Sequence, residues 1–227
     1  MEKFAIIVAG GSGSRMNTAI PKQFIPIGDK PILMHTIQRF LDYSETITII
    51  LVLPKDQMET WHSLCKEYSF NHPIIIAEGG KTRFESVKNG LSKIYTSNGL
   101  VAVQDGVRPF VTYKIIKDTY ELAQEKGNAI AAVALKDSIR SIDGEKSKSE
   151  DRNKFKLIQT PQTFILSELK KAYQTADDPL FTDDASVLEK SGAPIYLAEG
   201  SYQNIKITTS EDLLYAEAIL KSFNYAG

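Results

Sequence analysis

Short runs rich in Val and Ile recur along the first part of the chain, separated by segments with apolar residues at helical spacing. The runs do not alternate with polar residues, which is typical of strands buried on both faces of a parallel sheet. They cover residues 4–9, 47–53, 73–77, 100–104 and 129–135. Helical spacing is clearest at Leu33, Ile37, Phe40 and Leu41, at Phe84, Val87, Leu91 and Ile94, and at Ile115, Ile116, Tyr120 and Ala123. This order predicts an α/β fold, a Rossmann-like three-layer sandwich with a mostly parallel central sheet.

The succession of apolar runs and helix-like segments stops between residues 137 and 160. Residues 143–154 contain no apolar side chain and are flanked by short alternating stretches. This pattern predicts two strands of a long β-hairpin that protrudes as an arm, and a disordered surface loop is the alternative. With no internal repeat and no linker, we expect residues 1–227 to form a single domain with 137–160 as its arm.

Four further elements are expected after the arm. They are helices at 166–176 and 185–190, a strand at 195–198 and a terminal helix from Glu211 onward. Thr208 and Glu211 have the spacing of a capping box at the start of that last helix. In a parallel sheet ligands bind beyond the carboxyl ends of the strands, so a site is expected just after Ala9, Ala77 and Gln104.

Composition narrows the possible partners. Of 227 residues, 42% are hydrophobic and 24% are charged, and the formal net charge is −1. This excludes disorder and predicts neither nucleic-acid nor membrane binding. Because Cys65 is the single cysteine and there are three histidines, a metal should be a hard cation on oxygen ligands. The apolar run at the N-terminus is much shorter than the roughly 20 residues that span a bilayer, which predicts a cytoplasmic protein.

The glycine-rich stretch AGGSGSRM, residues 9–16, directly follows the first predicted strand. Glycines there let backbone N–H groups approach a phosphate closely, and a tight turn that needs glycine for steric reasons is the alternative. Met16 stands where a dinucleotide fingerprint needs a small residue, and Pro21 interrupts the helix that would follow. This loop also lacks the Gly-Lys-Ser/Thr that closes a P-loop. Arg15 and Lys22 could instead bring two cations to one triphosphate, as nucleotidyl transfer requires.

Six sequence blocks in order carry a resemblance. The first, AGGSGSRM followed by PKQF, is similar to the signature of the sugar nucleotidyltransferases. The others are GGKTRFESV at 79–87, DGVRP at 105–109, QTPQ at 159–162, FTDDA at 181–185 and NIKIT at 204–208. Together they resemble the 2-C-methyl-D-erythritol 4-phosphate cytidylyltransferase family over residues 4–220. The resemblance implies a cytidylyltransferase of the non-mevalonate isoprenoid pathway that forms a CDP-alcohol and pyrophosphate.

The resemblance also implies the binding of CTP. Residues expected to contact the nucleotide are Ala9, Gly10, Gly11, Gly13, Gly80, Lys81 and Ser86. The residues expected to have catalytic roles at the phosphates are Arg15, Lys22, Arg152 and Lys206. Arg83 matches an arginine of the family, with support of its loop through hydrogen bonds as the alternative. Ser86 could equally be a serine on a helix surface, and Lys206 a solvated lysine on a strand.

The acceptor, a polyol phosphate, is expected to contact Asp105, Arg108, Ser138 and Thr182. Asp105 and Asn204 match the ligands of Mg²⁺ or another divalent cation. Asp105 could alternatively be a turn former, while Asp183 and Asp184 could cap the following helix.

The chain departs from the family pattern at a few positions. Gln104 replaces a usual histidine, and Ala134, Ser138 and Arg140 stand where Pro, Thr and Lys are commoner. Glutamine removes a group that titrates near neutral pH. The mechanism does not require such a group there, because the acceptor phosphate is already a nucleophile.

The family also implies a homodimer whose arms pair, so that Arg152 reaches the acceptor phosphate in the neighbouring subunit. Two other functions stay open. Ribitol 5-phosphate cytidylyltransferases share nearly all the blocks and differ mainly in the acceptor. A nucleotide-binding module without catalysis is the more distant alternative, which the presence of Arg15, Lys22 and Asp105 disfavours.

Overall fold

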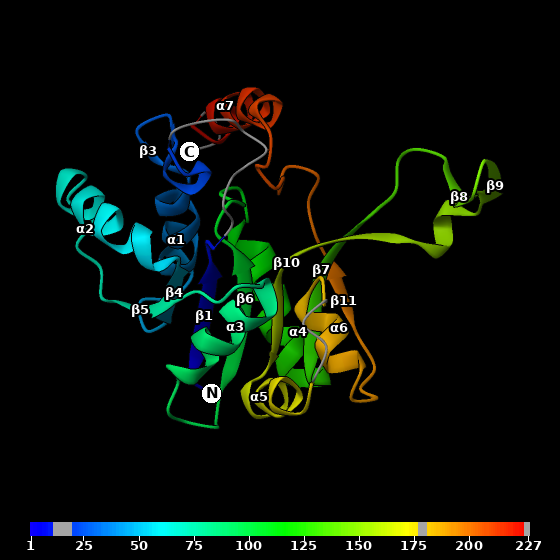
Figure 1. The fold of residues 1–227 in the computed structure, drawn as a ribbon, viewed down its shortest axis with the longest axis horizontal. Coiled ribbons are helices and arrows are strands. Elements are labelled where there is room, and N and C mark those ends of the chain that lie inside the picture. The colour runs from blue at the N-terminus through cyan, green and yellow to red at the C-terminus, as the bar shows by residue number, and fades with distance from the viewer. Residues whose placement is uncertain (11–19, 177–180, 225–227) are drawn as a thin grey trace.

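A seven-stranded sheet forms the centre of the computed structural model, which describes residues 1–10, 20–176 and 181–224 (Figure 1). In sheet order the strands are β11 (Leu197–Glu199), β7 (Asn128–Ala134), β10 (Lys156–Ile165), β6 (Leu100–Asp105), β1 (Lys3–Val8), β4 (Thr48–Leu53) and β5 (Ile74–Glu78). Only β10 within this sheet runs antiparallel to its neighbours. The expected Val- and Ile-rich strands are therefore confirmed, with ends shifted by at most one residue.

Helices cover both faces of the sheet, which confirms the predicted three-layer α/β sandwich. The apolar residues of α1 (Ile32–Tyr43), α2 (Met58–Glu67) and α4 (Tyr113–Lys126) pack in one core. Those of α3 (Arg83–Ser92), α5 (Leu166–Thr175) and α6 (Asp184–Glu189) pack in a second core on the other face. Successive strand residues point to opposite faces, so Ala102 enters the first core while Val101 and Val103 enter the second.

A third, smaller core lies above the carboxyl ends of the strands. There α7 (Ser210–Asn224) packs against the short hairpin β2 (Pro26–Ile27) and β3 (Lys30–Pro31). The predicted capping box lies one residue further along than expected. Thr209 Oγ1 accepts from the backbone N–H of Asp212 at 3.4 Å, and Asp212 Oδ2 accepts from that of Thr209 at 2.8 Å. Asp212 rather than Glu211 makes the reciprocal bond because the helix begins at Ser210.

The predicted arm requires a correction. Its hairpin consists of β8 (Ile139–Asp143) and β9 (Lys146–Glu150), which project from the body of the molecule (Figure 1). The second strand lies inside the polar stretch, and Gly144 makes the turn with a φ of 58°. The short 3-10 helix η4 (Arg152–Lys154) follows, and the residues from Lys156 onward belong to the central strand β10.

Two other 3-10 helices lie beside strand ends: η2 (Lys22–Phe24) beside the end of β1 and η3 (Lys55–Gln57) directly after β4.

Across the described ranges 1–10, 20–176 and 181–224, the helices are too short or too polar to cross a bilayer.

Candidate active site

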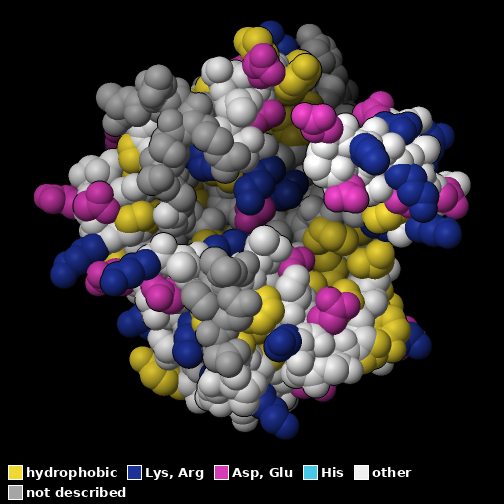
Figure 2. All heavy atoms as spheres, turned by 45° about the vertical axis from the view of Figure 1, so that its right-hand side comes forward, with side chains coloured by type: hydrophobic (Ala, Val, Ile, Leu, Met, Phe, Trp, Pro, Cys, Tyr) yellow, Lys and Arg dark blue, Asp and Glu magenta, His cyan; other side chains and the backbone are white. Residues whose placement is uncertain are grey.

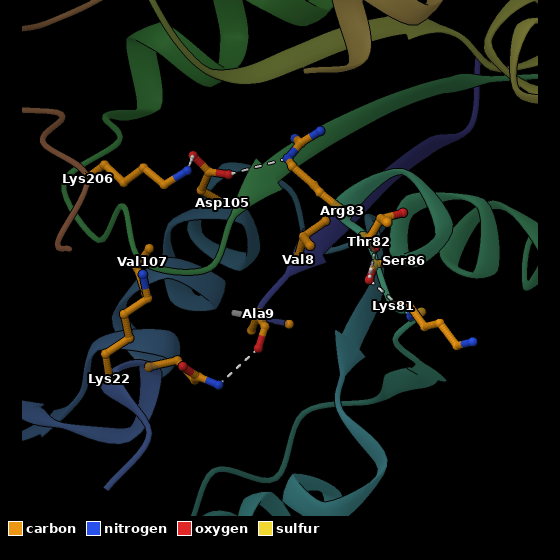
Figure 3. Close-up of a pocket in the computed structure, with 13 residues that line it drawn as sticks. Val8, Ala9, Lys22, Lys81, Thr82, Arg83, Ser86, Asp105, Val107 and Lys206 are labelled. Atoms are coloured by element: carbon orange, nitrogen blue, oxygen red, sulfur yellow. Dashed lines mark hydrogen bonds and ion pairs between the residues drawn. The ribbon is translucent and has the colours of Figure 1, made fainter. Parts of the chain in front are cut away.

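A group of charged side chains lines a cavity of about 420 Å³ at the carboxyl ends of β1, β5 and β6 (Figure 3). This is the edge of the sheet where the sequence predicted a site. The described residues that line it are Val8, Ala9, Gly10, Lys22, Gln23, Gly80, Lys81, Thr82, Arg83, Ser86, Asp105, Val107 and Lys206. Seven of the residues predicted to bind the nucleotide or its phosphates therefore meet here, namely Ala9, Gly10, Gly80, Lys81, Ser86, Lys22 and Lys206.

Asp105, the last residue of β6, is surrounded by three cations. Its Oδ2 accepts from Lys206 Nζ and from Arg108 Nε, each at 3.1 Å, while Arg83 Nε lies 3.9 Å from Oδ1. Burial alone would raise the pKa of Asp105. The charges of Lys206, Arg83 and Arg108 outweigh this effect and lower the pKa to about 2. The carboxylate is therefore ionised at neutral pH.

Lys206 lies in a segment without regular secondary structure rather than on a strand. Its neighbours anchor this segment, because Ile207 is fully buried in the third core and Ile205 packs against it. The backbone N–H of Ile207 donates to the Val107 carbonyl at 2.9 Å and ties the segment to the end of β6. Figure 3 shows the Lys206 side chain directed at Asp105.

The loop after β5 presents backbone groups to the cavity. Ser86 Oγ accepts from the Gly80 N–H at 3.1 Å and donates to the Thr82 carbonyl at 2.8 Å, so this buried hydroxyl shapes the loop. Its single proton is thus engaged inside the protein. Thr82 caps α3, and Glu85 Oε2 accepts from the Lys81 N–H at 2.6 Å. The Lys81 side chain extends away from Asp105 (Figure 3), which leaves its backbone as the part that faces a ligand.

Gln23 is a lining residue that the sequence analysis did not assign. Its Nε2 donates to the Ala9 carbonyl at 2.9 Å and also to Gln57 Oε1, so this buried amide fixes the end of β1. The sequence feature that could have identified Gln23 is its place beside Lys22 in the PKQF block. Lys22 starts η2 directly after Pro21 and lines the cavity.

A second cavity of about 380 Å³ adjoins the first. Both are lined by Arg83, Asp105 and Lys206. The second cavity also contains Thr182 and Arg108 from the predicted acceptor set. Its remaining lining residues are Ile158, Gln159, Thr160, Gln162, Asp183 and Ser186. Four of these belong to β10, whose first residues the sequence predicted as part of the arm, so this antiparallel strand builds the acceptor side of the site.

Asp183 and Asp184 have separate tasks. Asp183 Oδ1 accepts from the backbone N–H of Ser186 at 3.0 Å and so caps α6, as the alternative reading of this residue predicted. Asp184 is fully buried, and its Oδ2 lies 2.7 Å from Arg83 Nη2. Burial would lower the pKa of Arg83, but the negative charge of Asp184 raises it well above its usual value.

The structure does not bring every predicted residue to these cavities. Arg152 is exposed at η4, where it donates to the Lys136 carbonyl, and Ser138 is exposed at the base of the arm. Neither lines the two cavities described above. Arg15, Gly11 and Gly13 lie outside the described residues. Their predicted roles stay predictions.

Gln104 faces the opposite side of the sheet from Asp105. It follows Ala102 on the face of the first core, is fully buried, and donates to the Arg108 carbonyl at 3.3 Å. The position that is usually histidine in the family therefore does not contact either cavity in this chain.

Asn204 lies beneath the site rather than on its surface. The side chain is fully buried, and its Nδ2 donates to the Thr160 carbonyl at 2.9 Å and to Gln159 Oε1 at 3.2 Å. Its Oδ1 has no hydrogen-bond partner within the described part of the chain. Asp105 Oδ1 likewise accepts no hydrogen bond from the described residues, since Arg83 Nε, 3.9 Å away, is beyond hydrogen-bond distance. Both oxygens are ligand types that suit Mg²⁺, but only Asp105 lines the cavities, whereas Asn204 Oδ1 is buried and outside the lining of both.

The site as a whole favours an anionic ligand. Figure 2 shows Lys and Arg side chains gathered with an acidic side chain at the hollow in the middle of this face. Among the described residues that line the first cavity, Lys22, Lys81, Arg83 and Lys206 are cationic and Asp105 is acidic. Fold and site together define a nucleotide-binding α/β protein with the layout of a nucleotidyltransferase.

Comparisons with known proteins identify the family. A family model described as 2-C-methyl-D-erythritol 4-phosphate cytidylyltransferase matches residues 4–222. The chain belongs to this family, which confirms the resemblance, the fold class and the class of enzyme predicted from the sequence.

Individual relatives agree with this assignment. The enzyme of this name from Bacteroides thetaiotaomicron is 48% identical over 220 residues, covering 97% of this chain and 100% of the relative. The crystal structure of 4-diphosphocytidyl-2C-methyl-D-erythritol synthase from Anaerococcus prevotii superimposes with a TM-score of 0.83 at 30% identity, covering 97% of this chain and 98% of that one. A Francisella tularensis 2-C-methyl-D-erythritol 4-phosphate cytidylyltransferase gives 0.79 at 31% identity, covering 96% and 99%.

Proposed function

We propose that the chain transfers the cytidylyl group of CTP to 2-C-methyl-D-erythritol 4-phosphate. A phosphate oxygen of the acceptor attacks the α-phosphorus of CTP, the bond from that phosphorus to the bridging oxygen breaks, and pyrophosphate leaves. The observation that carries the proposal is the meeting of two cavities at Arg83, Asp105 and Lys206 in a chain of this family. One cavity accommodates the nucleotide, and the other accommodates the acceptor.

Charge neutralisation and alignment account for the catalysis. Lys22 and Lys206 line the nucleotide cavity and would stabilise negative charge on the phosphates as the pentacoordinate transition state forms. Arg15 is assigned to the same task from the sequence. No covalent enzyme intermediate and no proton abstraction are needed, because the attacking phosphate is already anionic at neutral pH.

Recognition of the cytosine base is assigned to the loop after β5. The backbone of Gly80 and Lys81 lines the cavity, and its two N–H groups are held by Ser86 Oγ and Glu85 Oε2. The fixed carbonyl acceptors that remain match the donor edge of one base and leave other bases unpaired, which favours CTP over other nucleotides. Thr182 and Arg108 in the second cavity are assigned to the acceptor.

A divalent cation, Mg²⁺ in the simplest case, is proposed to bind with the nucleotide. Asp105 Oδ1 could hold it, with triphosphate oxygens and water completing the coordination. Asn204 Oδ1, which the resemblance also assigns to the ion, would have to leave its buried position to reach it. When bound, the ion would neutralise charge on the triphosphate. Asp105 is prepared for this role because its pKa of about 2 keeps it ionised.

Association into a homodimer through the arm is proposed as well. Ile142 on β8 is exposed, as are Phe155 and Leu157 at the base of the arm. An apolar surface of this kind is stabilised when a second copy covers it. The arm would then carry Arg152 to the acceptor phosphate in the neighbouring subunit. A cytoplasmic location also stays a prediction from the sequence.

The experiment that tests the function is pyrophosphate release from CTP with each acceptor offered separately. We expect rapid release with 2-C-methyl-D-erythritol 4-phosphate, little with ribitol 5-phosphate, and loss of activity on chelation of divalent cations. Comparable turnover with ATP or UTP would contradict the base-recognition proposal. Faster release with ribitol 5-phosphate would reassign the acceptor, which the family match does not favour.

A further inference from the structure

Arg83 lies between the two cavities, and its guanidinium faces a carboxylate on each side. Its Nη2 is 2.7 Å from Asp184 Oδ2, and its Nε is 3.9 Å from Asp105 Oδ1. The side chain lines both cavities. A small displacement of this guanidinium would therefore change the surface that each substrate meets.

Asp184 is fixed independently of Arg83. The residue is fully buried, and its Oδ1 accepts from the Tyr173 hydroxyl at 2.6 Å. Its backbone N–H donates to Gln162 Oε1 at 3.0 Å, which ties α6 to the central strand β10. Each carboxylate oxygen thus has one strong partner, so Asp184 can hold Arg83 in one direction only.

Tyr173 completes the support from α5. Its ring stacks on Phe84, the residue next to Arg83, with centroids 4.7 Å apart and planes 16° apart. Burial, reinforced by the negative charge of Asp184, raises the pKa of Tyr173 well above its usual value. The hydroxyl therefore stays protonated and donates throughout the working pH range.

We infer that Asp184 and Tyr173 are positioning residues, which hold the Arg83 guanidinium at the junction of the nucleotide and acceptor cavities. A buried ion pair is weak evidence for stability, because apolar residues of similar volume often stabilise a fold as well. The Arg83–Asp184 pair instead fixes the orientation of the Arg83 guanidinium. Without it, the nearest carboxylate for Arg83 is Asp105, and a closer Arg83–Asp105 pair would withdraw both groups from the substrates. The inference rests on the proposed transfer reaction.

Tyr173→Phe tests the inference with a small change in volume. It removes the hydroxyl that orients Asp184 and leaves the ring to stack on Phe84. Because misalignment at the reacting groups affects the rate more than the binding, we expect kcat to fall about tenfold while the KM for CTP changes by less than about threefold. Asp184→Asn should give a larger fall of the same kind.

Tyr120→Phe is the matched control. Tyr120 is equally buried, and its hydroxyl donates to the Phe4 carbonyl at 2.7 Å in the core on the other face of the sheet. Both variants should lose thermal stability, but Tyr120→Phe should keep the kcat of the parent. Equal kcat values for the two variants would overturn the inference, because the Tyr173 hydroxyl would then be structural only.

A second measurement asks whether Tyr173 acts through Arg83. In an Arg83→Gln background, with enzyme in excess so that slow turnover is visible, adding Tyr173→Phe should change the rate by less than about twofold. A full additional tenfold loss would overturn the inference. Failure of the proposed function is a different result, because the unsubstituted chain would then release no pyrophosphate from CTP and either acceptor.

Discussion

Lys206 Nζ lies 3.1 Å from Asp105 Oδ2, so a residue near the C-terminal helix pairs with the last residue of a central strand. Together with Arg83 and Arg108, this lysine keeps the carboxylate ionised in spite of its burial. The same contact joins the nucleotide cavity to the acceptor cavity. The charge of the site, the attachment of the segment around Lys206 to β6 and the alignment of the two substrates therefore all depend on the Asp105 carboxylate.

Asp105→Asn should lower the free energy of unfolding in a pH-dependent way. The pKa of Asp105 is depressed from 3.8 to about 2 in the folded state, which corresponds to roughly 2 kcal/mol of stability. A depressed carboxyl pKa contributes stability above the unfolded-state value, and this contribution is lost as the pH falls through the folded-state value. The difference between the parent and Asp105→Asn should therefore be nearly full at pH 7 and fall below half by about pH 2.5.

Urea unfolding of both proteins at several pH values measures this difference. Asp143→Asn is a suitable control because Asp143 lies exposed in the arm. A gap between parent and Asp105→Asn that stays constant down to pH 2.5 would show that the carboxylate is not stabilised by its cations.

Lys22→Ala should lower turnover far more than it weakens CTP binding. The lysine lines the nucleotide cavity, and its charge is assigned to the transition state, in which negative charge on the phosphates is redistributed. We expect kcat to fall by about a hundredfold or more, with the Kd for CTP, from calorimetry, changing by less than about tenfold. Lys81→Ala is the control, because that side chain points away from Asp105 in Figure 3. Equal losses in kcat and affinity would make Lys22 a ground-state contact.

Gly80→Ala should disturb the base-binding loop. A Cβ at this position would lie 2.2 Å from Glu85 Cβ, far inside van der Waals contact, so the loop or the start of α3 must shift. Because the Gly80 N–H donates to Ser86 Oγ, the shift should break that bond and raise the KM for CTP by about tenfold or more. The KM for the acceptor should change little.

Gly10→Ala offers a comparison within the same cavity. An added Cβ there meets Ser86 Oγ at 3.5 Å, which is an ordinary contact. If Gly80→Ala raised the KM for CTP no more than Gly10→Ala does, the close packing on Glu85 would have no bearing on nucleotide binding.

Gln104→His should leave the rate and its pH dependence almost unchanged. The side chain faces the core opposite to Asp105, so a histidine there would not contact the phosphates. Turnover between pH 5.5 and 8 provides the measurement. A rise of about tenfold with a new titration near pH 6–7, equal to ~1.4 kcal/mol of barrier, would reveal a proton transfer absent from the proposed mechanism.

The sequence predicted those parts of the fold that local pattern determines. The runs that became β1, β4, β6 and β7 are buried on both faces, and their lack of polar alternation signals this directly. The run that became β5 has the same pattern but lies at the edge of the sheet, where Ile75 is exposed. The sequence placed the first part of β10 in the arm and missed the rest of the strand, because Gln159, Thr160, Gln162 and Thr163 look like loop residues. They are buried nonetheless, and three of them make hydrogen bonds that hold the site together.

The candidate site likewise contains residues that the local sequence predicts and contacts that it does not. The glycine-rich blocks and Asp105 could be found because they follow strands, and their meeting point is a general property of parallel sheets. The pairing of Arg83 with Asp184 could not be predicted, because nothing in the local sequence indicates which buried carboxylate a distant arginine will meet. For Arg83 the alternative of loop support was also incomplete, since its charge reaches across to α6.

Mixing Arg152→Ala subunits with Lys22→Ala subunits should restore activity. In the proposed homodimer each site takes Lys22 from one chain and Arg152 from the other, so both single variants should be nearly inactive alone. One site of a mixed dimer then receives both intact residues, while the other lacks both. Because Arg152 is exposed and lines neither cavity of its own chain, restored activity would have to come from the neighbour. About half of the subunits pair productively after random exchange, so activity should recover to about a quarter of that of the parent.

Arg140→Ala serves as the control for the arm, because Arg140 is exposed on β8 and bonds only to Ser147 on β9 among the described residues. Mixed with Lys22→Ala, it should give at least as much activity as the Arg152→Ala mixture, since Arg140→Ala leaves every assigned site residue intact. Subunit exchange is verified separately with two affinity tags. If exchange occurs and the Arg152→Ala mixture stays inactive, Arg152 does not act across the interface, and a fully active monomer in sedimentation would exclude the dimer requirement altogether.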